Sequence, residues 1–325
     1  MRLLTRLLTA ATLLGLAATA FAQPPVQHWP TRTLRIVVPA PPGGPYDRSI
    51  RPLAQHMART LGQPIVIDNR PGAGNIIGTQ AGASAAPDGY TLTMTGLQNA
   101  IAASVYDKVP FDIVEDFAHV GAIGEGPQWL VVRTGAGIAS FADLLAQARQ
   151  APGRIDYASS GAGSTGHLLM EQLQRSADIT LTHVPYKGGA PALQDVLGGV
   201  VAVIVVPSNA AMAPVQAGQL QVLAVSSRVR SPLVPQVPTF AELGLPQLTV
   251  SAWVGLSAPR GTPAPIVRKL NAALHAALRD PAIARQMDTE GLTALPDTPA
   301  HYTQLVRDDT ARFGELVRSL NLKAN

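Results

Sequence analysis

The sequence contains no cysteine, and this absence removes several classes of site at once. A thiolate metal site, a cysteine nucleophile, a disulfide and a lipid anchor on an N-terminal cysteine are all excluded. The seven histidines show no metal-ligand spacing, and no pair of carboxylates stands out for acid–base catalysis. We therefore expect neither a metal site nor a cofactor.

Long hydrophobic runs are also missing, with one exception near the start of the chain. The run "LLTAATLLGLAATAFA" follows Arg2 and Arg6 and ends in Ala20-Phe21-Ala22, an A-x-A cleavage pattern. It is shorter than the ~20 apolar residues that usually span a membrane. A membrane anchor is the alternative, but the pattern predicts a cleaved secretory signal peptide at residues 1–22 and an exported, soluble mature chain.

Charge is sparse: 14% of the residues are charged and the formal net charge is +4. No run of Lys or Arg and no interleaving of basic with aromatic residues is present, so nucleic acid is not expected as a partner. Removal of Arg2 and Arg6 with the signal peptide leaves a mildly basic protein. This balance suits a small anionic ligand.

Strand-like and helix-like segments alternate along the chain, which is typical of α/β proteins with parallel strands. "TLRIVVPA" precedes the helical pattern "DRSIRPLAQHMARTL", and a second series begins near Ile123 with "PQWLVVR" and "SFADLLAQARQ". The mature length exceeds a usual single core. We expect two α/β lobes with a cleft between them, formed by residues 23–122 plus 250–325 (lobe 1) and 123–249 (lobe 2).

Two glycine-rich turns, "PPGGPYD" and "SGAGSTG", each follow a predicted strand and precede a predicted helix. Such turns lie at the carboxyl ends of strands, where ligands bind in open α/β sheets. Free N–H groups at the helix N-terminus favour an anion, glycine lets it approach, and Ser164 and Thr165 add hydroxyl donors. Asp47 would oppose an anion and is expected to be an N-cap or first-turn acid. The two turns are interpreted as two halves of one anion site.

Other interpretations of these turns remain open. "GAGSTG" matches the G-x-G-x-x-G pattern of dinucleotide folds, but the next strand ends in "THVPYKGG", without the expected acid. "AGSTG" resembles a nucleophile elbow, which would make the protein a secreted serine hydrolase centred on Ser164, with Asp195, His275 or His301 as partners. Both turns are also compatible with tight connections that bind nothing.

The chain resembles the Bug family of periplasmic solute-binding proteins, whose relatives include the TctC component of tripartite tricarboxylate transporters. The similarity covers nearly all of the mature chain. It runs in order through "WPTRTLRIVVPAPPGGPYD", "GQPIVIDNRPGAGNIIGTQAGASAAPDGYTL", "VPFDIVEDFAHV", "PGRIDYASSGAGSTGHLLMEQL", "THVPYKGGAPALQDVLGG", "AGQLQVLAVSS", "PQVPTFAEL" and "PRGTPAPIVRKLNAAL".

The resemblance implies a type II, Venus-flytrap-like periplasmic binding protein with a hinged cleft and no catalysis. A small carboxylate would be held by backbone N–H groups and water, and the loaded monomer would meet TctA- and TctB-like membrane subunits or a sensor. Carried over by position, the first loop is Pro42, Gly43, Gly44, Pro45, Tyr46 and Asp47. The second loop is Ser160, Gly161, Ala162, Gly163, Ser164 and Thr165, and "TGLQNA" supplies a side wall with Thr95, Gln98 and Asn99.

Three departures from the family pattern bear on the shape of the cleft. Tyr46 is bulky where a small residue is usual, Ala202 stands where an aspartate is common, and Val205-Val206-Pro207 replaces aromatic or polar residues. The identity of the ligand therefore cannot be copied from relatives.

Overall fold

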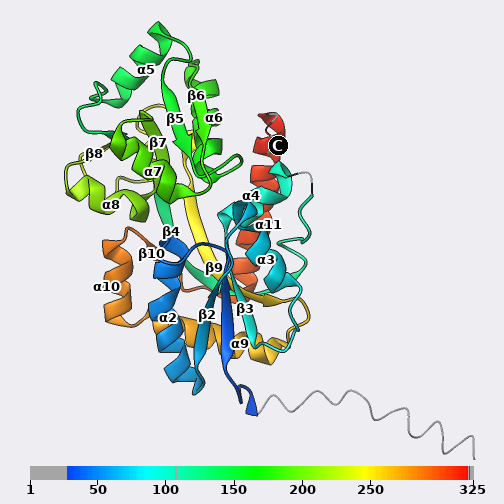
Figure 1. Cartoon of the computed structure of the whole chain (residues 1–325). Coiled ribbons are helices and arrows are strands. Elements are labelled where there is room, and N and C mark those ends of the chain that lie inside the picture. The colour runs from blue at the N-terminus through cyan, green and yellow to red at the C-terminus, as the bar shows by residue number, and fades with distance from the viewer. Residues whose placement is uncertain (1–27, 107, 321, 323–325) are drawn as a thin grey trace, which may run out of the picture.

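The computed structural model describes residues 28–106, 108–320 and 322, and the predicted signal peptide lies outside them. The described residues form two α/β lobes (Figure 1). The strands are β1 (Leu34–Val38), β2 (Ile65–Asn69), β3 (Thr91–Gly96), β4 (Phe117–Arg133), β5 (Asp156–Ser159), β6 (Thr182–Pro185), β7 (Val203–Pro207), β8 (Leu220–Val225), β9 (Ser251–Pro259) and β10 (Thr293–Ala294).

The helices cover the faces of these strands, as the βα alternation requires. They are α2 (Pro45–Leu61), α3 (Ile76–Ala83), α4 (Leu97–Val105), α5 (Phe141–Gln150), α6 (Thr165–Ala177), α7 (Gly189–Gly198), α8 (Ser208–Gln216), α9 (Ala264–Leu278), α10 (Pro281–Thr289) and α11 (Pro299–Ser319). Two short 3₁₀ segments, Ala73–Asn75 and Pro246–Leu248, lie between them.

Lobe 1 is built on the strand order β2-β1-β3-β9-β4, in which β1 pairs in parallel with β2 and β3. Helix α2 has one apolar face, on which Ile50, Leu53, Met57 and Leu61 recur at helical spacing and are buried. In lobe 2, β5 pairs in parallel with both β6 and β7. The carboxyl ends of β1 and β5 therefore lead directly into the first and second loops.

Strand β4 belongs to both lobes. Up to Pro127 it pairs with β9 of lobe 1, and from Gln128 it pairs with β7 and β8 of lobe 2. The return connection passes through Ser226, which is fully buried. Its hydroxyl accepts from the Gln128 N–H at 2.8 Å and donates to the Val250 carbonyl at 2.5 Å. One side chain thus ties together the segments that connect the lobes.

The lobes also share part of their hydrophobic core. A buried cluster extends from Val105 of α4 and Phe313 of α11 to Leu168 of α6 and Val203 of β7. Separate clusters lie in lobe 1, with residues of β1, α2 and α9, and in lobe 2, with residues of β7, α7 and α8. The lobes therefore pack against each other on the side formed by α4, α6 and α11 (Figure 1).

The predicted α/β class with two lobes is confirmed, and most expected elements are present. Ser140 is the N-cap of α5 and accepts a hydrogen bond from the Asp143 N–H. The sequence patterns do not predict β9, α4, α7, α8 or α10. They also place the start of the second series, near Ile123, in the middle of β4. The first half of β4 was missed because it pairs with β9, far away in the chain, as Phe117 does with Pro259.

Candidate functional site: two equivalent glycine loops

The first loop connects β1 to α2 and is held from within lobe 1. Gly43 has a φ of +74°, a conformation that glycine adopts without strain. Its N–H donates to Asp47 Oδ2 at 2.9 Å, and the Gly44 N–H donates to the Pro41 carbonyl. Pro42 is exposed, while Pro45 occupies the first position of α2. The loop is therefore closed by a side chain of the helix that it precedes.

Asp47 is buried and already fully engaged. Besides Gly43, it accepts two hydrogen bonds from Arg51 and one from Asn69. Burial opposes ionisation of this carboxyl, but these hydrogen bonds outweigh it and lower the pKa of Asp47. The charge of Asp47 is thus balanced by Arg51, and the carboxylate is a support of the loop, in agreement with its expected role as a first-turn acid.

The second loop connects β5 to α6 and repeats this geometry in lobe 2. Gly163 has a φ of +73°, and its N–H donates to His167 Nδ1 at 2.9 Å. The Ser164 N–H donates to the Gly161 carbonyl at 3.1 Å, and Ser164 is the N-cap of α6. Asp47 and His167 are both the third residue of their helix and lie four residues after the glycine. The two loops are therefore structurally equivalent.

The N–H groups that remain unpaired lie in the first turns of the two helices. Within the described part of the chain, no protein acceptor is found for the N–H groups of Tyr46 and Asp47 in α2, or of Thr165 and Gly166 in α6. Helix N-termini carry partial positive charge, so these donors can bind a carboxylate without a basic side chain. Gly43 and Gly163 use their own N–H groups inside the loops, so the unpaired donors lie further along, in the first turns of the helices.

The lobes touch near both loops. Arg48 of α2 donates to the Gly43 carbonyl at 3.0 Å and to the Asn209 carbonyl of α8 at 3.3 Å, so that α2 and α8 meet across the lobes (Figure 1). On the other side, a Cβ atom added to Gly163 would overlap the side chain of Val105 in α4. The second loop therefore lies directly against lobe 1.

In the segment expected to form a side wall, the side chains of Thr95 and Asn99 are hydrogen-bonded within the protein. Thr95 is fully buried, and its hydroxyl shares hydrogen bonds with Ser257 and Tyr302. The Asn99 side chain accepts from the Gly96 N–H and donates to Thr79. Both side chains are thus hydrogen-bonded within lobe 1.

Two further side chains near this segment have different environments. Gln98 is half-buried at the start of α4, with no protein hydrogen bond found for its side chain in the described part of the chain. A Cβ atom added to Gly96 would overlap the hydroxyl of Tyr46, so the ring of Tyr46 lies against Gly96. The bulk of Tyr46 therefore packs against lobe 1, and burial raises the pKa of its hydroxyl.

A hydrolytic triad around Ser164 is not assembled among the described residues. The Ser164 hydroxyl accepts from the His167 N–H, and its φ of −67° is unstrained, unlike a nucleophile elbow. Asp195 accepts from the Tyr186 hydroxyl, while His301 pairs with Asp297. No group of three metal-ligating side chains and no helix long and apolar enough to cross a membrane occurs in the described part of the chain.

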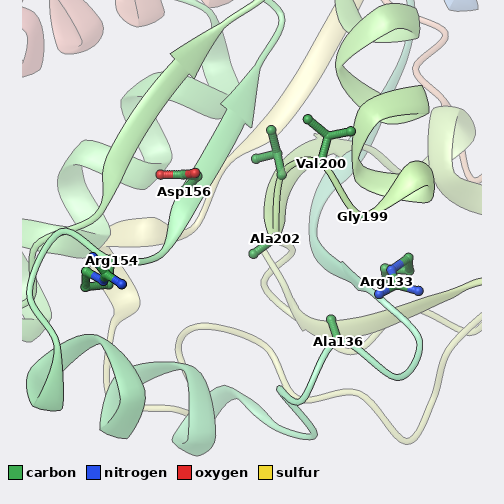
Figure 2. A pocket seen from close by; sticks show the side chains of 8 residues that line it. Arg133, Ala136, Arg154, Asp156, Gly199, Val200 and Ala202 are labelled. Carbon is green, nitrogen blue, oxygen red and sulfur yellow. The ribbon is translucent and has the colours of Figure 1, made fainter.

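A surface pocket of about 210 Å³ lies at the other end of lobe 2, and it does not coincide with the loops. It is lined by Arg133 and Arg154 near the amino ends of β5 and β7, and Figure 2 shows these two side chains on opposite sides, with Asp156 on the side of Arg154. Ligands in open α/β sheets bind at the carboxyl ends of strands. The two glycine loops are therefore the better candidate site.

Comparison with known proteins defines the class to which this fold and this pair of loops belong. The family described as "Tripartite tricarboxylate transporter family receptor" matches residues 49–322, and the chain belongs to this family. Protein BugT of Bordetella pertussis is 35% identical over 98% of this chain and 99% of its own length.

Solved structures show the same fold. The periplasmic binding protein BugD is 31% identical, with a TM-score of 0.85, over 91% of this chain and all of its own. MatC from Rhodopseudomonas palustris, solved with bound malate, is 34% identical with a TM-score of 0.83, over 89% of this chain and all of its own. A second R. palustris protein, solved with adipate, is 32% identical with a TM-score of 0.86, over 91% of this chain and all of its own. These relatives confirm the expected periplasmic-binding-protein fold and the Bug resemblance.

Sequence reasoning missed the roles of His167 and Asp47 as acceptors for the glycine N–H groups. The signal was present in the spacing: each glycine is followed four residues later by a side chain with an acceptor atom. Only the helix starts, at Pro45 and Thr165, show that both acceptors occupy the same position of the first turn.

Proposed function

We propose that this protein captures a small carboxylate, mono- or dicarboxylate, between its two lobes in the periplasm, for uptake or sensing and without catalysis. The observation that carries the proposal is the pair of equivalent loops, each with unpaired N–H groups at a helix N-terminus. Relatives solved with malate and adipate support the same ligand class. Carboxylate oxygens accept several N–H donors, and a donor array of this kind needs no arginine.

The ligand-binding set follows from the geometry of the loops. We place the carboxylate between the first turns of α2 and α6, where Tyr46, Asp47, Thr165 and Gly166 contribute backbone N–H groups. The Thr165 hydroxyl and the Gln98 side chain complete the set. The remaining loop residues shape the backbone, and Thr95 and Asn99 hold the wall of lobe 1 in place.

The lobes are the moving parts in this proposal. We expect residues 23–122 plus 250–325 in one body and 123–249 in the other, with residues 123–127 of β4 still attached to lobe 1 by their pairing with β9. The pairing change between Pro127 and Gln128 in β4 supports a hinge at this point. The closed form would present the ligand to TctA- and TctB-like membrane subunits or a sensor, with a signal peptide at residues 1–22 directing export and the protein acting as a monomer.

A thermal-shift screen over mono- and dicarboxylates, including malate and adipate, tests the proposal. A ligand present at 100 times its dissociation constant adds about 2.7 kcal/mol to the free energy of unfolding, which gives a clear rise in Tm. A specific rise for one or a few carboxylates, and no turnover of model esters, is expected. A screen without any stabilising carboxylate, or ester turnover abolished by Ser164→Ala, would overturn the proposal.

A further inference from the structure

His167 stands out because it is a buried histidine whose acceptor nitrogen closes a ligand loop. It is 6% exposed, and its Nδ1 accepts from the Gly163 N–H at 2.9 Å. An imidazole nitrogen can accept a hydrogen bond only when it carries no proton. The geometry therefore requires the neutral ring with its proton on Nε2.

The ring is held in place by its neighbours, so it cannot follow a displaced loop. His183 stacks on it with 4.0 Å between ring centroids and 11° between planes, and Tyr157 stacks on the pair. His183 Nε2 lies 2.7 Å from Ser159 Oγ, which also bonds to both backbone polar groups of Gly161. Two imidazoles thus support the second loop at Gly161 and at Gly163.

We propose that His167 is a positioning residue for the ligand: its neutral ring fixes Gly163, so that the Thr165 and Gly166 N–H groups point at the carboxylate. This inference rests on the proposed function. Protonation would place an Nδ1–H opposite the Gly163 N–H, and two donors cannot bond to each other. The second loop would shift, and ligand affinity would fall in acid.

The titratable groups that face His167 are few. They are Tyr157 of β5, His183 of β6 and Glu171 of α6, whose Oε1 lies 3.7 Å from His167 Nε2. Burial lowers the pKa of His167 and that of His183 to about 4. Affinity should therefore be constant near neutral pH and fall as the pH approaches 4, where protons begin to occupy the ring.

Two substitutions separate positioning from bulk packing. His167→Phe keeps a stacking ring without an acceptor, and it leaves the buried Gly163 N–H unsatisfied. His167→Asn places an amide oxygen close to the position of Nδ1 and has no proton to gain. We expect a loss of affinity of at least about fivefold for Phe and near-normal affinity for Asn. His119→Asn is the control, because His119 is equally buried but lies in lobe 1, away from the loops.

Calorimetric titration with malate and with adipate between pH 7 and pH 3.5, which passes through the pKa of His167, supplies the first readout. The acid loss of affinity should be smaller in His167→Asn than in the wild type and unchanged in His119→Asn. The ligand's own carboxyl groups titrate identically in all three proteins, so the difference between them isolates His167. Normal affinity of His167→Phe, or equal acid losses in His167→Asn and wild type, would overturn the inference.

Amide hydrogen exchange at Gly163 in the ligand-free protein supplies a second readout that needs no ligand. Protection of this N–H should be lost in His167→Phe and retained in His167→Asn. Equal protection in all variants would overturn the inference on its own. Absence of binding to any carboxylate by the wild type, with normal exchange behaviour, would instead contradict only the proposed function.

Discussion

The Asp47 carboxylate accepts the Gly43 N–H at 2.9 Å, which is also the distance from His167 Nδ1 to the Gly163 nitrogen in the other lobe. The side chains one turn further along the two helices carry opposite charges: Arg51 pairs with Asp47, and Glu171 approaches His167. The same backbone geometry is therefore supported by a charged acceptor in lobe 1 and a neutral acceptor in lobe 2.

Asp47→Ala should destabilise the protein and weaken ligand binding, because it frees Gly43 and leaves Arg51 without its partner. Removing one member of a buried hydrogen-bonded network typically costs about 1–3 kcal/mol. Asp47→Asn keeps one oxygen for the Gly43 N–H, so it should lose stability but retain most of the affinity. Urea unfolding and calorimetry on both variants check this, and equal affinity losses for Ala and Asn would contradict the role of the acceptor.

Gly43→Ala and Gly163→Ala should differ although both glycines have the same φ. At Gly43 no atom lies near the added Cβ, so only the backbone conformation is strained, at about 1–2 kcal/mol. At Gly163 the Cβ overlaps Val105 of the other lobe, so the second loop must shift away from α4 and affinity falls. Adding Val105→Ala to Gly163→Ala should restore part of the affinity. Titration of the single and double variants decides this, and an absence of any rescue would contradict the contact.

Stability should fall as the pH is lowered from about 6.5 to 4. Burial lowers the pKa of His119, His167 and His183 from 6.5 to about 4. Above pH 6.5 neither state binds these protons; between 6.5 and 4 the unfolded chain takes them up and the folded chain does not. Each histidine then contributes a slope of up to about 1.4 kcal/mol per pH unit. Urea unfolding at several pH values should show a shallower slope for His119→Asn, and an unchanged slope would contradict the account.

Ser226→Ala should destabilise the connection between the lobes. The substitution leaves the Gln128 N–H and the Val250 carbonyl without their partner, at a cost of about 1–3 kcal/mol for each unsatisfied group. Ser227→Ala is a matched control, since the Ser227 hydroxyl bonds only to the nearby Val229 carbonyl. Equal free energies of unfolding for the two variants would show that Ser226 does not hold the connection.

The sequence could predict the two loops because their signals are local: a strand, glycines and a helix start in that order. It could not predict which N–H groups are already paired, because for that the first residue of each helix must be known. The hydrogen bonds of Thr95 could not be predicted either, because its partners, Ser257 and Tyr302, come from the end of the chain. The pairing of β4 with β9 was missed for the same reason, because it joins residues far apart in sequence.

The central claim is that backbone N–H groups at two helix ends hold the carboxylate, without an indispensable cation. Calorimetric titration of Lys187→Met and of the double variant Ser164→Ala, Thr165→Val with a cognate carboxylate tests it most directly. Lys187 is exposed, so its loss should change affinity by less than about tenfold, or 1.4 kcal/mol. The double variant removes the cap of α6 and a hydroxyl beside the unpaired N–H groups, and it should lose more. If Lys187→Met abolishes binding while the double variant binds normally, a point charge holds the anion and the account of both loops is contradicted.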